Sequence, residues 1–402
     1  MTAHRRARFD DLVTGRALAF PPPRRVIAAG RPADVPAALA EVERLTAAGE
    51  WAYGYVSYEA APAFDPALVV AAPAAGDPPL VWFGVGGPPA PVPPIAPDRA
   101  SPGERRPGAG ALEEARQPGA GALEWAPAWT DQQHARAVER VREHIAAGDT
   151  YQCNLTDRLR AAATGDPFDL YRQIAGAQGG AFNAYLDLGR FVVASASPEL
   201  FFDWTGDRIR TRPMKGTTTR GADPADDAER AQRLRASPKE QAENLMIVDL
   251  LRNDLSRVAT VGSVEVTELF ALEAYPTVWQ MVSEIAASVR PGTGLADVFR
   301  ALFPCGSVTG APKARSMGII RDLESGPRGV YCGAVGMVAP PAAEFRARFN
   351  VAIRTAMVDR RSGTATYGAG GGITWGSDAA AERAELLAKT AVLNPRGQEA
   401  YV

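Results

Sequence analysis

One lysine stands in a short segment whose residue types favour nucleophilic chemistry. Lys215 lies in the run Arg-Pro-Met-Lys-Gly-Thr from Arg212 to Thr217, between Pro213 and Gly216. A lysine amine is a nucleophile only when it is deprotonated, and a nearby cation or partial desolvation favours that form. Proline fixes φ, and glycine lets the backbone approach a ligand closely. The segment predicts a turn that presents Lys215 to a ligand, although an ordinary surface lysine fits these six residues about equally well.

Two pairs of glutamates have a spacing that places both members of a pair on one helix face. Glu240 and Glu243 are three residues apart, and so are Glu382 and Glu385. If the two helices face each other, four carboxylates converge and repel one another unless a cation lies among them, and such oxygen donors suit Mg²⁺. The structural alternative is that Glu240 completes a capping box and that Glu385 pairs with Lys389.

The composition excludes several other kinds of site. The 402 residues carry a net charge of −2, so there is no overall field that attracts nucleic acid. Three widely spaced cysteines form neither a disulfide framework nor a zinc pattern, which fits a reducing compartment. The sequence has no signal-peptide pattern and no membrane-spanning apolar run, so we expect a cytoplasmic protein without membrane contact. With only three histidines, its chemistry must rest on carboxylates, lysines, arginines and backbone amides.

The chain changes in character along its length. Residues 1–87 predict a mixed α/β region integrated with the catalytic fold, with strand patterns at 51–59 and 80–83. Residues 88–127 are rich in Pro, Gly and Ala, which predicts a flexible insert. Residues 128–395 are expected to form the catalytic domain.

Within that domain, helices and strands follow one another without regular βαβ alternation. A helix is predicted from Asp131 to Ala147, another beginning at Pro238 with Ser237 as its N-cap, and a last one after Asp378. Strands are predicted at residues 152–159, 181–186, 190–195 and 200–204. We therefore expect an α+β fold of large antiparallel sheets packed with outer helices, and not a Rossmann fold.

A series of longer motifs carries a family resemblance. The motifs, in chain order, are Gly148–Leu155, Ser197–Glu199, Arg212–Thr217, Ala242–Leu255, Gly306–Lys313, Tyr331–Gly333, Ala352–Thr355, Ala369–Gly372 and Glu382–Glu385. Together they resemble the chorismate-utilising enzymes, which include anthranilate, aminodeoxychorismate, isochorismate and salicylate synthases. The resemblance covers roughly the last two thirds of the chain and implies an enzyme that acts on chorismate with Mg²⁺.

The resemblance also implies roles for individual residues. It makes Glu243 and Glu385 the Mg²⁺ ligands, with Glu240 and Glu382 close by or bridged through water. It makes Glu199 the acid that protonates the departing hydroxyl of chorismate. Arg354 matches the arginine that grips the enolpyruvyl carboxylate, where its planar fork suits bidentate pairing. The further implied substrate contacts are Gln152, Gly216, Thr217, Tyr331, Gly370, Gly371, Gly372 and Lys389.

Two positions separate the branches of the family. Relatives that use water carry lysine at the position of Gln152, so a glutamine there predicts ammonia as the nucleophile. Anthranilate synthases carry alanine at the position of Lys215, whereas aminodeoxychorismate synthases share the Pro-x-Lys-Gly-Thr pattern of this chain. The resemblance therefore favours the branch that makes 4-amino-4-deoxychorismate for 4-aminobenzoate and folate, with Lys215 attacking ring carbon C2.

Two alternatives remain at this point: an anthranilate-type synthase, and a non-catalytic subunit that binds chorismate. Relatives often have histidine in the segment where this chain has Thr277, Trp279 and Gln280, so no role is transferred to that histidine. Neither His134 nor His144 lies in a glutaminase pattern. We therefore expect a separate glutamine amidotransferase subunit to supply the ammonia.

Overall fold

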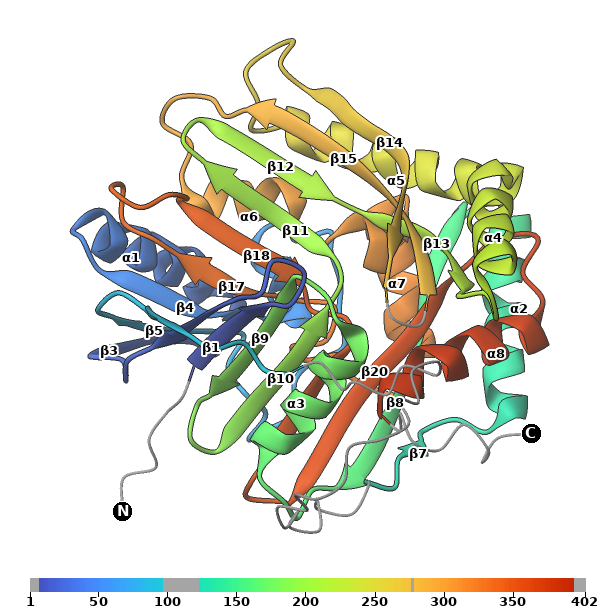
Figure 1. Cartoon of the computed structure of the whole chain (residues 1–402), viewed down its shortest axis with the longest axis horizontal. Coiled ribbons are helices and arrows are strands. Elements are labelled where there is room, and N and C mark those ends of the chain that lie inside the picture. Colours follow the sequence, from blue (N-terminus) through green and yellow to red (C-terminus); the bar gives the residue numbers. More distant parts are fainter. Residues whose placement is uncertain (1–6, 97–122, 276–277, 394–402) are drawn as a thin grey trace, which may run out of the picture.

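The computed structural model describes residues 7–96, 123–275 and 278–393. These residues form two large sheets with helices outside them (Figure 1). The central part of the expected insert, residues 97–122, lies outside the described residues. The two flanks of that insert form short strands that pair with the first sheet.

The first sheet has ten strands, in the order β16-β8-β20-β19-β10-β9-β1-β2-β6, with β7 paired to β8. Its strands are β1 (Ala7–Asp11), β2 (Arg16–Phe20), β6 (Ala90–Val92), β7 (Ala126–Pro127), β8 (Gln152–Ala162), β9 (Phe182–Asp187), β10 (Phe191–Ser197), β16 (Gly310–Ala311), β19 (Thr355–Asp359) and β20 (Thr364–Ile373). The β8–β20 pair is the longest ladder of this sheet and runs from Thr364 opposite Ala162 to Ile373 opposite Cys153.

The second sheet also has ten strands, in the order β13-β15-β12-β11-β18-β17-β4-β5-β3, with β14 paired to β15. Its strands are β3 (Arg25–Ala29), β4 (Trp51–Val56), β5 (Val81–Gly86), β11 (Leu200–Thr205), β12 (Arg208–Arg212), β13 (Met214–Thr219), β14 (Glu265–Ala274), β15 (Val278–Ser288), β17 (Ala334–Val338) and β18 (Ala347–Val351). Strands from the N-terminal region therefore extend both sheets.

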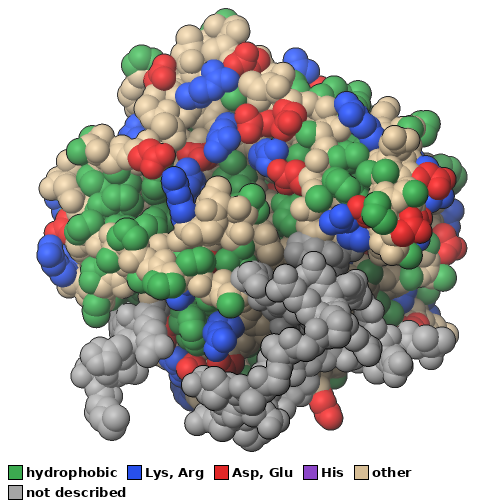
Figure 2. Space-filling model, in the orientation of Figure 1, with side chains coloured by type: hydrophobic (Ala, Val, Ile, Leu, Met, Phe, Trp, Pro, Cys, Tyr) green, Lys and Arg blue, Asp and Glu red, His purple; other side chains and the backbone are tan. Residues whose placement is uncertain are grey.

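The helices cover the outer faces of the sheets. They are α1 (Val35–Ala47), α2 (Asp131–Ala146), α3 (Pro167–Gln178), α4 (Pro224–Ala236), α5 (Pro238–Ser256), α6 (Leu295–Leu302), α7 (Lys313–Leu323) and α8 (Ala379–Thr390). In the described ranges, none of them has the length and apolarity needed to cross a bilayer. Figure 2 shows basic and acidic side chains interspersed over one face of the molecule.

The apolar core has three main layers. Tyr55 and Trp82 of the second sheet pack with Leu186 and Val193 of the first, which joins the inner faces of the sheets. The outer face of the second sheet packs on α1, α5 and α6, and the outer face of the first packs on α3. The expected α+β fold of antiparallel sheets with outer helices is confirmed, and every strand pairing among the described residues is antiparallel.

Two local predictions were wrong. Lys215 does not lie in a turn, because the chain resumes as edge strand β13 directly after Pro213. At the start of α5, Ser237 does accept a hydrogen bond from the Glu240 backbone N–H at 3.4 Å. The return bond is not made, because the Ser237 N–H donates to the carbonyl of Leu234 instead. The Glu240 carboxylate therefore completes no capping box and is available for another role.

Candidate active site

Most of the residues singled out in the sequence lie around one pocket of about 120 Å³. The pocket is formed where β8 and β20 of the first sheet meet β13 of the second, with α8 beside them. The sequence-predicted residues that line it are Glu199, Lys215, Gly216, Thr217, Tyr331, Arg354, Gly370, Gly371, Gly372, Glu385 and Lys389. The remaining four, Gln152, Glu240, Glu243 and Glu382, are not part of the lining.

A bulge in β13 places Lys215 at the pocket. Met214 pairs with Val282 and Thr217 with Gln280, so β13 contains one residue more than its partner strand between these points. Gly216 lies in this bulge with a φ of 96°, a conformation that favours glycine. The Lys215 carbonyl accepts a hydrogen bond from Asn244 Nδ2 at 3.4 Å, which ties the bulge to α5.

Gln152 lies next to Lys215 although it does not line the pocket. A Cβ atom on Gly372 would come within 2.2 Å of Gln152 Nε2 and 2.7 Å of Lys215 Nζ, so both side chains end beside this glycine. Gln152 is buried, and neither of its amide atoms has a hydrogen-bond partner among the described residues. A buried amide in this state is costly unless a ligand or water satisfies it.

Glu199 is a buried acid in the lining of the same pocket. Burial raises the pKa of Glu199 to about 7, against the opposing effects of a hydrogen bond from Ser307 and the charge of Lys215. Ser307 Oγ donates that hydrogen bond to Glu199 Oε1 at 2.7 Å. A carboxyl group with this pKa is protonated in an appreciable fraction of the molecules at neutral pH, and the protonated form can donate to a leaving group.

Sequence reasoning did not single out Ser307, although it lies in the motif Gly306–Lys313. Its neighbour Cys305 is buried, and the Ser307 hydroxyl also lies 3.3 Å from Cys305 Sγ. Gln280 was noted only as a departure from the family pattern. Its Nε2 donates to Thr217 Oγ1 at 2.9 Å and to the Gly216 carbonyl at 3.3 Å, so it supports the bulge of β13.

Arg354 enters the pocket from a strained stretch of backbone. Its φ is 51°, which places a non-glycine residue in the left-handed region. The Arg354 carbonyl accepts a hydrogen bond from Ala196 N at 3.0 Å, and Nη1 donates to Gln178 Oε1 at 3.3 Å. These bonds leave most of the guanidinium donors available to a ligand.

Lys389 connects α8 to the glycine-rich part of β20. Its Nζ donates to the Gly370 carbonyl at 2.7 Å and pairs with Glu385 Oε1 at 2.6 Å. A Cβ atom on Gly370 would come within 2.3 Å of the Leu155 carbonyl, so no side chain fits there. Glycine at this position therefore lets β20 pack closely against β8.

The four glutamates of the expected metal site lie on α5 and α8 at the edge of the pocket. Burial, and then the charges of Glu243 and Glu385, raise the pKa of Glu240. Burial also raises the pKa of Glu382, and the charge of Glu385 adds to this. Carboxylates on the two helices therefore lie close enough to repel one another, as the sequence pattern requires.

These donors suit Mg²⁺, which takes few protein carboxylates and keeps several waters. Glu240 Oε2 would lie 3.0 Å from a Cβ on Gly216, and Glu382 Oε2 would lie 3.1 Å from one on Gly371, so both carboxylates border the pocket lining. Within the three described ranges, however, no three acidic, Cys or His side chains already converge as a ready-made metal site. Glu385 is held by Lys389 instead, and that pairing lowers its pKa although burial opposes the shift.

Arg212, which lies three residues before Lys215, is not a free cation beside the Lys215 amine. Its guanidinium forms ion pairs with Glu268, Glu273 and Glu284 on β14 and β15. The positive charge of Arg212 is therefore neutralised away from the pocket.

The comparison with known families decides the family of this chain. The family described as chorismate binding enzyme matches residues 26–395. The chain belongs to the chorismate binding enzymes. Its fold agrees with this assignment: anthranilate synthase component I from Streptococcus pneumoniae TIGR4 superposes with a TM-score of 0.72 at 28% identity, over 86% of this chain and 80% of that one.

Two kinds of chorismate binding enzyme are similar in sequence to this chain. Aminodeoxychorismate synthase component 1 of Escherichia coli (strain K12) is 40% identical over 265 residues, which cover 66% of this chain and 57% of the relative. Anthranilate synthase component 1 of Streptomyces coelicolor is 41% identical over 268 residues, or 66% of this chain and 51% of the relative. The chain thus matches between one half and three fifths of the length of these relatives, and overall identity does not separate the two activities.

Proposed function

We propose that this chain converts chorismate and ammonia to 4-amino-4-deoxychorismate, as the chorismate-aminating component of an aminodeoxychorismate synthase. The observation that carries the proposal is the position of Lys215, whose amine ends beside Gly372 in the same pocket as the buried acid Glu199. In an anthranilate-type enzyme, ammonia must reach ring carbon C2. In this chain the Lys215 side chain would occupy the space over C2, so ammonia would have to add at another carbon. The names of the Escherichia coli and Klebsiella aerogenes relatives agree with the proposal.

The chemistry uses one acid and one nucleophile. Lys215 Nζ forms a bond to C2 of chorismate while the C4 hydroxyl leaves, taking the proton of Glu199 and departing as water. Ammonia then adds at C4, and the bond between C2 and Lys215 breaks, which returns the amine. Arg354 binds a substrate carboxylate. The side-chain amide of Gln152, which has no hydrogen-bond partner among the described residues, would bond to the incoming ammonia.

Mg²⁺ is the proposed cofactor, with Glu243 and Glu385 as ligands and Glu240 and Glu382 beside them. When bound, the ion would neutralise the ring carboxylate of chorismate. The mutual repulsion that raises the pKa of Glu240 supports a cation at this position. When the substrate binds, Lys389 would give up part of its ion pair with Glu385 and contact the substrate instead.

The direct test is turnover of the purified chain with chorismate, Mg²⁺ and an ammonium salt. We expect 4-amino-4-deoxychorismate, identified by its mass and ultraviolet spectrum, and no pyruvate. Release of pyruvate with a fluorescent aromatic amine would assign the chain to the anthranilate branch. Binding of chorismate without any turnover would make it a non-catalytic subunit.

Glutamine without ammonium is expected to give no product. Glutamine hydrolysis needs a nucleophile with a base, usually Cys-His-Glu. Among the described residues, His134 contacts Trp129 and His144 pairs with Asp149, and all three cysteines are buried. We therefore propose a separate glutamine amidotransferase subunit as partner. Product formed from glutamine by the rigorously purified chain would contradict this.

Removal of the metal, or of one proposed ligand, is expected to abolish turnover. EDTA should stop the reaction and added Mg²⁺ should restore it. Glu243→Ala and Glu385→Ala should each lose activity, and Glu243→Ala should do so with little loss of stability, because its removal relieves the repulsion between Glu243 and Glu240. The matched control is Glu139→Ala on the exposed face of α2, which should leave activity unchanged. Full activity in EDTA, or in Glu385→Ala, would refute the metal site; calorimetric titration of the substrate-free chain with Mg²⁺ gives a readout independent of turnover.

A further inference from the structure

A second group of polar residues lies on the same sheet face as the candidate active site. Side chains two residues apart in a strand share a face, and cross-strand partners lie beside them. The partners along this face of β8 and β20 are Asn154 with Gly372, Thr156 with Gly370, Arg158 with Gly368 and Arg160 with Thr366. The face therefore begins at the active-site glycines and continues to a pair of arginines.

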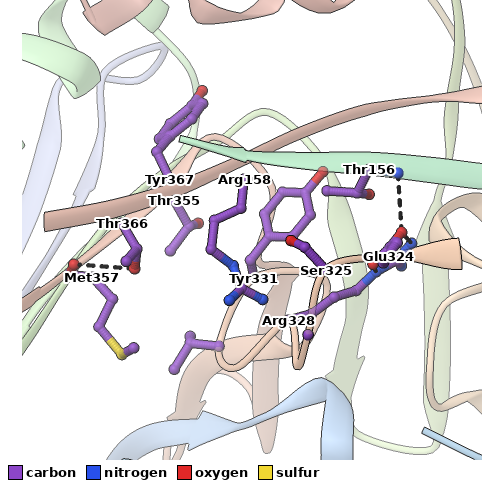
Figure 3. Close-up of a pocket in the computed structure, with 13 residues that line it drawn as sticks. Thr156, Arg158, Glu324, Ser325, Arg328, Tyr331, Thr355, Met357, Thr366 and Tyr367 are labelled. Atoms are coloured by element: carbon purple, nitrogen blue, oxygen red, sulfur yellow. Dashed lines mark hydrogen bonds and ion pairs between the residues drawn. The ribbon is translucent and has the colours of Figure 1, made fainter. Parts of the chain in front are cut away.

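The arginines border a cavity of about 420 Å³. A narrower cavity lies between this space and the active-site pocket: it shares Arg158 with the large cavity and Tyr331 with the active-site pocket. Figure 3 shows Arg158 extending alongside Tyr331 in this narrow part. Tyr331 forms the wall between the narrow cavity and the active-site pocket. Its ring packs directly on Gly368 of β20, where a Cβ atom would lie 2.4 Å from the ring.

Arg158 forms no direct ion pair with an acid of the described residues, although the charges of Glu324, Glu59 and Asp77 act on it from farther away. Its side chain makes no hydrogen bond or ion pair with any residue in the described parts of the chain, and no dashed line reaches it in Figure 3. Burial, and then the charge of Arg160, lower the pKa of Arg158. Arg158 is half-buried and lines the cavity, so its guanidinium, which has five N–H donors, is available to a ligand there.

The acids near Arg158 are already engaged with other groups. Glu324 pairs with Arg328 at 2.6 Å and accepts a bond from the Thr156 N–H at 3.0 Å. The acids that line the large cavity also have partners. Glu59 accepts hydrogen bonds from the backbone N–H groups of Arg328 and Gly329. Asp77 accepts one from the backbone N–H of Ala74, and Asp359 accepts one from the Arg190 side chain. The Ser57 hydroxyl, which also lines the cavity, is buried and without a partner among the described residues.

We infer that this cavity is a binding site for a small oxyanion, a carboxylate or a phosphate, held by Arg158 with Arg160 and Ser57 beside it. An oxyanion offers the acceptors that the guanidinium lacks, and Arg pairs with such groups through two parallel N–H bonds. The Gly326 backbone, with φ of 150°, passes close to Arg158, and a Cβ atom there would lie 3.7 Å from Nη1. The site is separated from the substrate pocket by Tyr331, so it is distinct from the contacts of Arg354 and Lys389. It does not depend on the proposed function.

The test is calorimetric titration with inorganic phosphate and, separately, with acetate. The chain should carry Arg354→Gln, so that binding in the active-site pocket is weakened and the second site dominates. We expect saturable binding of at least one probe at millimolar concentration, and the better of the two identifies phosphate or carboxylate as the ligand class. Arg158→Gln should weaken this binding at least ~10-fold, since a charge-assisted hydrogen bond contributes about 1.5–3 kcal/mol.

The matched control is Arg136→Gln, which removes an exposed arginine of α2 and should leave binding unchanged. Arg158→Lys retains the charge without the fork and should bind with intermediate affinity, which keeps the test valid if the glutamine variant fails to fold. The proposal is overturned if neither probe binds in the Arg354→Gln background. It is also overturned if the Arg158 variant that folds, whether Arg158→Gln or Arg158→Lys, weakens binding of the probe no more than Arg136→Gln does.

Discussion

Lys215→Ala is expected to reduce formation of 4-amino-4-deoxychorismate by orders of magnitude while chorismate still binds. If Lys215 is the covalent nucleophile, its removal takes away the first chemical step, whereas Arg354 and the proposed Mg²⁺ site still hold the substrate. If Lys215 were only a structural residue, its loss would change stability by at most about 0.5 kcal/mol and leave the rate unchanged. The measurements are steady-state turnover with ammonium and chorismate binding by calorimetry.

Lys215→Arg is the control that separates a nucleophile from a positive charge. Arginine keeps the charge near Glu199 but stays protonated, so it cannot attack C2. We expect this variant to be as inactive as Lys215→Ala. Because alanine uncovers the space over C2, a trace of the anthranilate-type product is a further expected signature of Lys215→Ala alone. Near-normal synthesis of aminodeoxychorismate by either variant would refute the mechanism and the choice of family branch.

The local patterns of the sequence predicted individual elements well. The last helix, predicted to begin after Asp378, is observed as α8, and the Asp378 side chain caps it by accepting bonds from the N–H groups of Ala380 and Ala381. The helix predicted from Asp131 to Ala147 is observed as α2, from Asp131 to Ala146. Such signals are local because caps and helix periodicity involve residues only a few positions apart.

What could not be predicted is set by contacts between distant residues. The pattern of Pro213 and Gly216 indicated a turn, but β15 offers β13 a partner about 65 positions further along the chain, and the glycine serves a bulge instead. The capping box at Glu240 failed for a local reason. Ser237 is both the C-cap of α4 and the N-cap of α5, so its N–H donates to the carbonyl of Leu234 at the end of α4.

The active-site residues were identified from motif resemblance rather than from physics alone, and the structure adds the interactions between them. No spacing rule indicates that Ser307 donates to Glu199, since more than one hundred positions separate the two residues. The position of Arg158 is equally invisible in sequence, because its lack of a direct ion pair among the described residues follows from how the acids near it are already bonded. Sequence identifies candidate groups, and tertiary structure decides which of them are satisfied.

Glu199→Gln is expected to abolish turnover and to leave the protein folded. Glutamine is nearly isosteric and still accepts the hydrogen bond from Ser307, but it cannot donate an acidic proton to the leaving hydroxyl. In the wild type, burial raises the pKa of Glu199 to about 7, so the protonated form is present below that value. The rate of the step that needs this acid should therefore fall as the pH rises through about 7.

The stability of the same variant separates a catalytic acid from a structural carboxylate. Because the folded pKa of Glu199 lies above the ordinary value of 4.5, the unfolded chain releases this proton first, and the contribution of Glu199 to stability decreases between pH 4.5 and about 7. Glu199→Gln removes that dependence, so at pH 8 it should unfold at a temperature no lower than the wild type. Glu139→Gln, on the exposed face of α2, should change neither activity nor the pH profile. Turnover retained by Glu199→Gln would show that Glu199 is not the acid that protonates the leaving hydroxyl. A wild-type rate that rises through pH 7, with the same dependence of rate on pH in Glu199→Gln, would show this as well.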